Sequence, residues 1–337
     1  MAAPLRGFAR PTLARLRLSH RYPLVLGSRA QSTSTLPLPP GSWDSHVHVI
    51  CNEFKFPYHP EAGYRPQEAP LSRLQTFHAN LHPHITHHVL VALSIHGTDN
   101  SCLLESLKTL AAQSLPARGV ASIDPLVVSD SELQILHAAG VRGARMNLKS
   151  SLLEPSAADF ERTLRAYADR LKPLKSWPLQ IHLSLRQIPL IADILPRLGV
   201  PVIIDHLAAP DAATQPLRPA QEQEGYKEFM RLLARGEVYT KLSGSDRFAA
   251  LPLLDEYATE VVAVAPQRVV WATDWPHTGG VKMNPGGNRR KQQGFRAVDD
   301  HGKLRRAMEV YCRGDESVIK QVWRDNAREL WDYDGED

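Results

Sequence analysis

Two histidines stand two residues apart in the segment Trp43-Asp-Ser-His-Val-His48. If this segment is a β-strand, His46 and His48 lie on one face, because successive side chains of a strand alternate between faces. Two imidazoles directed at one spot can hold a metal ion or orient a carbonyl group. A single His-x-His pair is weak evidence in a chain with 15 histidines. The hypothesis therefore depends on what other segments bring to the same place.

Polar side chains also stand in or just after several other stretches that have the composition of buried strands. In a barrel of parallel strands, the carboxyl ends of the strands meet on one face, where active sites are found. We therefore expect these side chains to lie near the histidine pair. They are His96, Arg145, Asn147, Lys149, His182, Asp205, His206, Lys241, Ser243, Asp246, Arg247, Thr273, Asp274 and His277.

Four of these residues form a set suited to one metal ion. His46, His48, His182 and Asp274 offer three imidazoles and a carboxylate, which suits Zn²⁺ or a similar divalent ion with a position left for water. Such an ion lowers the pKa of water and polarises a carbonyl. Asp274 is also the predicted base for the attacking water, and His206 is predicted to orient that water or to stabilise an oxyanion.

The cations of the set predict a carboxylate substrate. Arg145, Lys149 and Arg247 can clamp a carboxylate through charge-assisted hydrogen bonds. Asn147, His96 and His277, at the same strand ends, complete the predicted substrate-binding residues. Because no phosphate-binding loop motif accompanies the cations, the pattern favours a small organic acid over a nucleotide.

Eight short β-branched stretches alternate with amphipathic ones. This rhythm over about 300 residues predicts a single-domain (β/α)₈ TIM barrel at residues 41–334, with a helix at about 315–331 on its exterior. A doubly wound open sheet is the alternative, and the lack of a Gly-x-Gly-x-x-Gly or Walker pattern weakens it. The predicted strands are 43–48, 88–95, 118–123, 142–147, 178–183, 200–205, 237–242 and 268–273, and the predicted helices are 100–113, 130–139, 156–172, 185–198, 220–235 and 251–265.

The segment 279–296 follows the last predicted strand and is rich in glycine and basic residues. It is either a solvated surface loop or an active-site loop that supplies cations for an anionic substrate. Its position directly after a barrel strand gives the second interpretation weight.

The basic charge of the chain is concentrated at its N-terminus. Residues 1–43 contain six arginines and no Asp, Glu or Lys, which leaves 34 basic against 36 acidic residues in the rest. Residues 1–36 have the composition of a mitochondrial transit peptide and linker, so we expect import into the matrix; a disordered basic tail is the alternative. We expect neither a nucleic-acid partner nor, without an apolar run of about 18 residues, a membrane span.

The three cysteines, Cys51, Cys102 and Cys312, are far apart and form no Cys-x-x-Cys. An odd number without local pairing argues against a disulfide framework and for a reducing compartment.

Six motifs together carry a resemblance to a known family. They are Asp44-Ser-His-Val-His48, His96-Gly-Thr-Asp-Asn100, Gly140-Val-Arg-Gly-Ala-Arg-Met-Asn147, Ile204-Asp-His206, Lys241-Leu-Ser243 and Thr273-Asp-Trp-Pro-His277. From about Ser42 to Trp331, the chain resembles the amidohydrolase-related family of metal-dependent TIM-barrel hydrolases. Within that family, the likeness is to the 2-pyrone-4,6-dicarboxylate lactonases.

The resemblance implies hydrolysis of a lactone that carries carboxylates. In those lactonases the counterpart of Asp274 is the base, the counterparts of His46, His48 and His206 polarise the lactone carbonyl, and arginines that match Arg145 and Arg247 hold the carboxylates. The implied partner is a small-molecule carboxylate, and a homo-oligomer stays open.

The chain departs from the lactonase pattern at two positions. The lactonases have a tyrosine in place of His182 and work without metal, whereas metal-binding relatives have histidine there. A substrate-gripping arginine is replaced by Ser151, with Lys149 nearby, and lysine does not reproduce a bidentate arginine. The resemblance therefore favours a different carboxylated lactone and leaves open whether Asp274 acts with or without a metal.

Two other functions stay in consideration. One is a metal-dependent, non-oxidative decarboxylase of an unsaturated carboxylic acid, because relatives with all five of the core residues catalyse that reaction. The other is a non-catalytic barrel that only binds a ligand. Such a protein should have lost core residues, and His46, His48, His182, His206 and Asp274 are all present.

Overall fold

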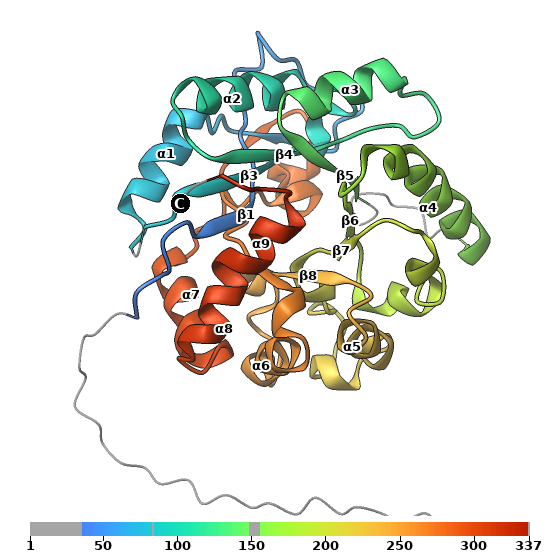
Figure 1. Cartoon of the computed structure of the whole chain (residues 1–337), viewed down its shortest axis with the longest axis vertical. Helices are drawn as coiled ribbons and strands as arrows, with labels where there is room; N and C mark the ends of the chain where they lie inside the picture. The colour runs from blue at the N-terminus through green and yellow to red at the C-terminus, as the bar shows by residue number, and fades with distance from the viewer. Residues whose placement is uncertain (1–35, 83, 148–155, 336–337) are drawn as a thin grey trace, which may run out of the picture. The chain divides into compact units, whose positions relative to one another are not determined.

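The computed structural model describes residues 36–82, 84–147 and 156–335. Eight described strands form one parallel sheet in chain order, and the last strand returns to the first through a parallel bridge between Val47 and Trp275. The predicted (β/α)₈ barrel is therefore confirmed, and the open sheet is excluded (Figure 1). The strands are β1 (Trp43–Val47), β3 (His87–Val91), β4 (Ala117–Ala121), β5 (Val141–Asn147), β6 (Leu179–His182), β7 (Val202–Ile204), β8 (Tyr239–Leu242) and β9 (Val269–Trp271).

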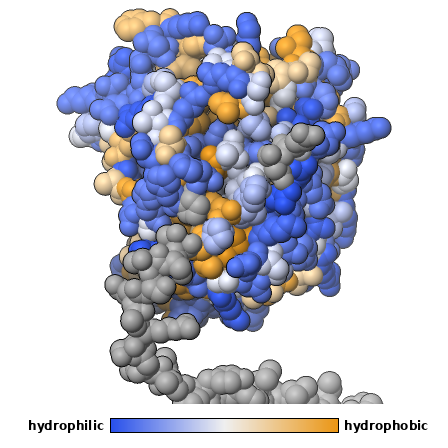
Figure 2. All heavy atoms as spheres, turned by 60° about the vertical axis from the view of Figure 1, so that its left-hand side comes forward, coloured by the Kyte–Doolittle hydropathy of each residue, from blue (hydrophilic) through white to orange (hydrophobic). Residues whose placement is uncertain are grey.

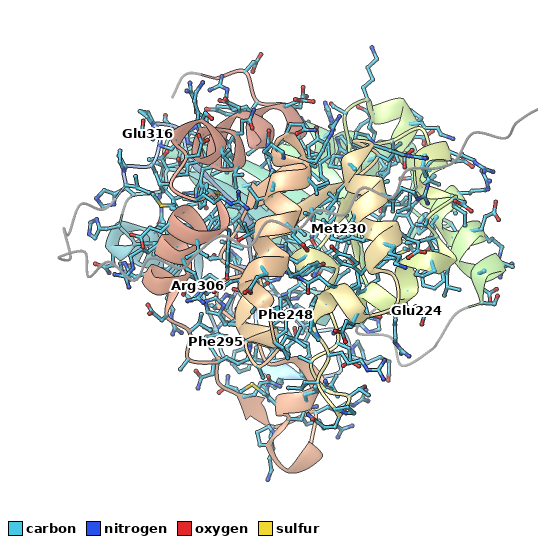
Figure 3. The ribbon with its side chains drawn as sticks, turned by 90° about the horizontal axis from the view of Figure 1, so that it is seen from below. Glu224, Met230, Phe248, Phe295, Arg306 and Glu316 are labelled. Atoms are coloured by element: carbon cyan, nitrogen blue, oxygen red, sulfur yellow. A yellow bond between two sulfur atoms is a disulfide. The ribbon has the colours of Figure 1, made fainter. Side chains whose placement is uncertain are left out.

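Helices surround the strands in Figure 1, as expected for a parallel sheet whose strands are buried. The side chains of Ser129 and Ser156 cap the first turns of α3 and α4. Arg306 of α7, labelled in Figure 3, pairs with Asp255 of α6. The helices are α1 (Leu71–Asn80), α2 (Ser101–Ala112), α3 (Asp130–Ala138), α4 (Ala157–Leu171), α5 (Tyr226–Ala234), α6 (Leu254–Val264), α7 (Asp300–Arg306), α8 (Glu316–Lys320) and α9 (Asn326–Leu330).

One predicted helix is wrong, and two helices were not predicted. The segment 185–198 forms two short 3₁₀ turns, Leu185–Leu190 and Leu195–Arg197, instead of an α-helix. Pro189 and Pro196 lie inside this segment, and a proline in a helix interior removes a hydrogen bond and clashes with the preceding turn. Helices α1 and α7 lie in stretches that the sequence pattern left without an element.

The C-terminal helix forms where it was predicted, but its end does not stay on the barrel exterior. Leu330 and Trp331 are buried and pack with Trp43, Val89 and other interior side chains of the strands. The indole nitrogen of Trp331 lies 3.2 Å from Ser45 Oγ. The C-terminus therefore supplies part of the barrel core beneath the strand that carries the histidine pair.

A disulfide joins Cys51 to Cys102, which contradicts the prediction that the cysteines are unpaired. Cys51 lies just beyond β1 and Cys102 lies in the first turn of α2. Their Cα atoms are 6.0 Å apart although 51 residues separate them. The tertiary structure brings these two segments together, and the spacing of the cysteines in the sequence gives no indication of the pairing. Cys312 is the free, buried cysteine.

The glycine-rich basic segment after β9 packs against the segment after β1. Its strand β10 (Gln292–Gln293) pairs in parallel with β2 (Arg65–Pro66), and Asn284 donates to the Gly63 carbonyl. Arg296 also pairs with Asp246, which follows β8. The segment thus connects loops that follow three barrel strands, while its proposed contact with an anionic substrate stays a prediction.

The described surface is mainly polar. Hydrophilic residues dominate the face in Figure 2, and the most exposed large apolar side chains are Phe54, Leu126 and Val127. No helix in the described ranges combines the length and hydrophobicity needed to cross a bilayer.

Candidate active site

The histidine pair lies at the seam where the barrel closes. The Asp274 amide donates to the His46 carbonyl at 3.0 Å, and the His48 amide donates to the Trp275 carbonyl at 2.8 Å. These two hydrogen bonds hold the chain after β9 beside the end of β1. Asp274 is therefore placed next to both histidines by the same contacts that close the sheet.

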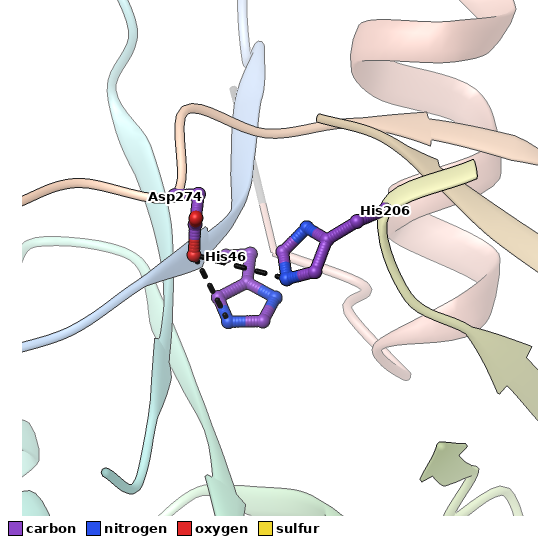
Figure 4. A group of neighbouring side chains, drawn as sticks. All are labelled: His46, His206 and Asp274. Atoms are coloured by element: carbon purple, nitrogen blue, oxygen red, sulfur yellow. Dashed lines mark ion pairs between the residues drawn. The ribbon is translucent and has the colours of Figure 1, made fainter. Parts of the chain in front are cut away.

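Three imidazoles surround one oxygen of Asp274. Its Oδ1 atom lies 3.8 Å from Nε2 of His46, of His48 and of His206. Figure 4 shows Asp274, His46 and His206 directed toward one another. All four side chains are buried. This arrangement places one carboxylate and three ring nitrogens around a single position.

The chain around His206 has an unusual backbone. His206 follows β7, and residues 206–209 all have positive φ angles, a conformation that costs an L-residue roughly 1–2 kcal/mol. The Tyr257 hydroxyl donates to the Leu207 carbonyl at 2.7 Å, and His206 Nδ1 lies 2.7 Å from Ser243 Oγ. Buried contacts therefore hold a strained turn that presents His206 to Asp274.

Gly244 leaves no room for a larger residue beside His206. Its φ angle is +68°, and an added Cβ would lie 3.1 Å from His206 Cβ and 3.3 Å from its Nδ1. We expect Gly244→Ala to lower kcat by about 10- to 100-fold, because it displaces a site residue. Steady-state kinetics would measure this effect.

Gly236→Ala is the matched control, because Gly236 has the same φ of +68° but faces the Arg268 side chain. Both variants should lose roughly 1 kcal/mol of stability through backbone strain, and only Gly244→Ala should lose activity. An equal loss of activity in both would contradict a role for the His206 contact.

His182 lies on β6 beside His206, and their ring centroids are 5.0 Å apart. The four predicted ligands are not all members of one described group that could hold a metal ion. Two groups of side chains could hold a metal ion, and they share His206. One is His46, His206 and Asp274, and the other is His182, Asp205 and His206.

Burial keeps the imidazoles neutral at pH 7. It lowers the pKa of His48 to about 4 and lowers the pKa values of His46, His182 and His206 well below 6.5. A neutral imidazole has one N–H donor and one lone pair. Within the described residues, His182 Nε2, His206 Nε2 and Asp274 Oδ1 are buried without a hydrogen-bond partner. These unsatisfied atoms fit a site that takes an ion, a water or a substrate.

Asp274 is paired with Arg247, whose Nη2 contacts the second carboxylate oxygen. Burial by itself would raise the pKa of Asp274, but Arg247 and the neighbouring histidines lower it well below its ordinary value. Asp274 is therefore an ionised carboxylate at neutral pH, with Oδ1 directed at the imidazoles.

A buried ionic network lies on the other side of His46. Asp205 accepts hydrogen bonds from Arg145 Nε at 3.2 Å and from Gln180 Nε2 at 2.9 Å. Lys241, on β8, is completely buried and lies 3.8 Å from Asp205. Burial lowers the pKa of Lys241 to about 7, against the attraction of Asp205. These groups connect β5, β6, β7 and β8 within the barrel.

The network predicts a loss of stability in acid. Burial alone would raise the pKa of Asp205, yet Lys241 and Arg145 lower it from 3.8 to about 2. A carboxylate whose pKa is lower in the folded state stabilises the fold above its unfolded pKa. That contribution, roughly 2 kcal/mol, should disappear as the pH falls from about 4 to 2. Urea unfolding at several pH values would measure it.

Asp205→Asn should be less stable throughout, because it leaves two buried cations without their anion. Its stability should also fall less steeply than that of the wild type between about pH 4 and 2. The same slope in both proteins would show that Asp205 does not carry the effect.

The predicted substrate-binding residues differ in their contacts. Arg145 reaches the histidine cluster, with Nη2 3.3 Å from His182 Nδ1, and Asn147 pairs with His182 in strand register. His277 Nε2 lies 2.8 Å from Asp300, and His96 Nδ1 lies 3.3 Å from the Pro57 carbonyl. Their contact with a substrate stays a prediction. Lys149 lies outside the described residues.

Two further residues of the site, Asp44 and Tyr64, were given no role from the sequence pattern. Asp44 accepts from the Thr273 amide and hydroxyl and thereby positions the residue before Asp274. Tyr64 is buried, and burial raises its pKa, while a Thr278 hydrogen bond and then Arg145 and Arg247 oppose that shift. Tyr64 comes from a loop with no strand-end signal, whereas Asp44 belonged to the first motif but was given no role.

Comparison with known proteins shows the family to which the barrel belongs. The family model described as Amidohydrolase matches residues 43–333, which span the whole barrel. The chain belongs to the amidohydrolase family. As a member of this family, whose curated relatives are hydrolases, it is a hydrolase.

Two curated relatives match most of the barrel. A 2-pyrone-4,6-dicarboxylate hydrolase of Comamonas testosteroni is 31% identical over 253 residues, covering 71% of this chain and 78% of the relative. A 4-sulfomuconolactone hydrolase of Hydrogenophaga intermedia is 30% identical over 250 residues, covering 72% and 77%.

A solved structure from Pseudomonas putida has the same fold. It is described as a proposed 2-pyrone-4,6-dicarboxylic acid hydrolase and superposes with a TM-score of 0.68 at 25% identity. The match covers 89% of this chain and all of that chain. The resemblance inferred from the six motifs is thus confirmed at the level of the family.

Proposed function

We propose that this amidohydrolase hydrolyses a small lactone, or a related ester, that carries carboxylate groups. The observation that carries the proposal is the position of Asp274, whose free oxygen faces three neutral imidazoles while Arg247 contacts the other oxygen. The relatives named as hydrolases of 2-pyrone-4,6-dicarboxylate and 4-sulfomuconolactone support an anionic lactone.

The roles follow from the chemistry of each group. Ionised Asp274 accepts a proton from the attacking water. An N–H of His206, or of His46, stabilises the negative charge that develops on the carbonyl oxygen. Arg145 and Arg247 bind the substrate carboxylates. In our proposal the further substrate contacts come from Asn147, Lys149, His96 and His277.

We further propose that one divalent ion, Zn²⁺, binds here, held by Asp274, His46 and His48 together with His182. Two observations support this proposal: Asp274 Oδ1 and His182 Nε2 are buried without a hydrogen-bond partner among the described residues, and His46 and Asp274 belong to a group that could hold an ion. When bound, the ion would lower the pKa of water and polarise the lactone carbonyl. A mechanism in which Asp274 and the imidazoles act alone is the alternative.

A substrate panel tests the hydrolase proposal. Carboxylated and uncarboxylated lactones of similar ring size are incubated with the protein, and the products are examined by mass spectrometry. We expect ring opening with addition of one water and with preference for the carboxylated compounds. Loss of CO₂ from an unsaturated acid would instead support a decarboxylase, and no turnover of the whole panel would contradict the proposal.

Elemental analysis tests the metal. We expect about one equivalent of zinc in wild-type protein purified without chelator, and less in His182→Tyr, which removes an imidazole that the metal-free lactonases also lack. If the active wild-type protein contained no stoichiometric metal, the metal proposal would fail and the mechanism without metal would be supported.

We also propose mitochondrial import through residues 1–36, which lie almost entirely outside the described residues. The composition of this segment supports the proposal. N-terminal sequencing of the protein isolated from cells should find a start near residue 36, and an intact N-terminus in the cytosol would contradict it.

A further inference from the structure

Cationic side chains stand behind two of the imidazoles at the site. Nδ1 of His46 lies 3.3 Å from Lys241 Nζ, and Nδ1 of His182 lies 3.3 Å from Arg145 Nη2. Arginine and the lysine ammonium donate hydrogen bonds and accept none. A histidine that ligates a metal almost always donates its other ring N–H to an acceptor. The Nδ1 atoms of His46 and His182 therefore face hydrogen-bond donors, whereas the second nitrogen of a metal-ligating histidine normally faces an acceptor.

His48 provides the contrast within the same site. Its Nδ1 lies 2.7 Å from the Val91 carbonyl, which can only accept. The proton of His48 is therefore on Nδ1, and its Nε2 presents a lone pair to the site. Of the histidine pair, only His48 has a hydrogen-bond acceptor at its second ring nitrogen, as is usual for a metal ligand.

The surroundings of Lys241 account for all three hydrogens of its ammonium group. Nζ lies 2.9 Å from the Ser45 carbonyl and 2.7 Å from Gln180 Oε1. The amide of Gln180 is oriented by its donation to Asp205. The third hydrogen is left for His46 Nδ1. Asp205, at 3.8 Å, and the Trp331 ring, with its centroid 5.2 Å away, both favour the charged form.

These contacts assign the proton of His46. If Nδ1 accepts from Lys241, the proton is on Nε2, which lies 3.2 Å from the lone pair on His48 Nε2. The donors then run without conflict from Lys241 to His46, to His48 and to the Val91 carbonyl. Asp205 Oδ1 is 3.6 Å from His46 Nδ1, which is too long for a hydrogen bond and makes it a weaker competitor.

We propose that Lys241 is a positioning residue that keeps the proton of His46 on Nε2 and thereby lowers the affinity of the site for a divalent ion. Nε2 must give up its proton to ligate a metal, and Nδ1–H would then face the donors of Lys241. Arg145 acts in the same sense on His182. The inference refines the metal part of the proposed function, and its tests measure a tautomer and a binding constant. It can therefore fail or hold independently of turnover.

The first test uses the wild-type protein after removal of metal. Long-range ¹H–¹⁵N spectra report which ring nitrogen carries the proton, and comparison with His46→Asn assigns the signal. We expect Nε2–H for His46 and Nδ1–H for His48. A proton on Nδ1 of His46 in the wild type would overturn the proposal, regardless of the Zn²⁺ affinity measured for any variant.

The second test compares the Zn²⁺ affinity of Lys241→Met with that of the wild type by competition with a chromophoric chelator. We expect the association constant to rise by about tenfold or more, the size of effect that outer-shell partners of metal ligands have. Near-UV circular dichroism establishes that the variant is folded. An unchanged or weaker affinity in folded Lys241→Met would overturn the proposal.

Lys303→Met is the matched control. Lys303 is a largely buried lysine that donates to the Thr273 carbonyl and pairs with Asp246, without contact to an imidazole in the described structure. Its removal deletes the same charge, so it measures the long-range electrostatic effect on Zn²⁺ binding. The rise should be clearly smaller than in Lys241→Met, and His46 should keep Nε2–H. An equal rise in both variants would assign the effect to net charge and overturn the role of Lys241.

Discussion

Asp274→Asn is expected to lower kcat for a carboxylated lactone by about 10³- to 10⁴-fold, because it removes the group that accepts a proton from water. Asparagine has nearly the same shape, so the hydrogen bond of the residue 274 amide to the His46 carbonyl should persist. Steady-state kinetics measure the loss, and circular dichroism with thermal unfolding measures the fold.

Asp255→Asn is the matched control for this substitution. Asp255 lies on α6 and pairs with Arg306, outside the histidine cluster. The control removes the same negative charge and should keep nearly full activity. Full activity in Asp274→Asn would remove the assigned base and with it the proposed mechanism.

Arg247→Met is expected to raise KM for carboxylated lactones by about 100-fold, since it deletes a charge-assisted contact worth roughly 1.5–3 kcal/mol. Uncarboxylated lactones should be much less affected. Arg247→Lys should recover only part of the loss, because lysine lacks the planar fork of arginine. Kinetics on matched pairs of lactones with and without a carboxylate measure the discrimination.

The same variant should change the pH dependence of the reaction. Arg247 is the main group that lowers the pKa of Asp274, so its removal raises that pKa. The acid limb of kcat/KM should therefore move to higher pH. Arg306→Met, which removes a guanidinium that pairs with Asp255 on α6, should change neither property. Equal KM changes for charged and neutral lactones would show that Arg247 does not bind the carboxylate.

The residues of these predictions lie at or near the seam between the first and last strands of the barrel. His46 lies on β1, His48 directly follows it and Asp274 follows β9. Backbone hydrogen bonds across the seam set their register. Asp44 strengthens the seam, because it accepts from both the amide and the hydroxyl of Thr273. Closure of the barrel and assembly of the site are thus the same structural event.

The sequence by itself determined the barrel and the position of its eight strands to within a few residues. It also singled out His46, His48 and His206, which the structure places around Asp274. This was achievable because buried parallel strands have a distinct composition and because strand ends of a barrel meet on one face. One helix prediction failed because proline residues interrupt a segment whose hydrophobic pattern is helical. Two prolines divided the predicted helix at 185–198 into short turns.

Only the tertiary structure decided which groups touch. The Cys51–Cys102 disulfide joins segments 51 residues apart, and the contact of His277 with Asp300 joins the chain after β9 to α7. The partners of Lys241 come from β1 and β6, and Trp331 reaches it from the C-terminus. Sequence patterns predict which face a side chain occupies. Which nitrogen of His46 carries its proton depends on donors brought by distant segments, which no local pattern contains.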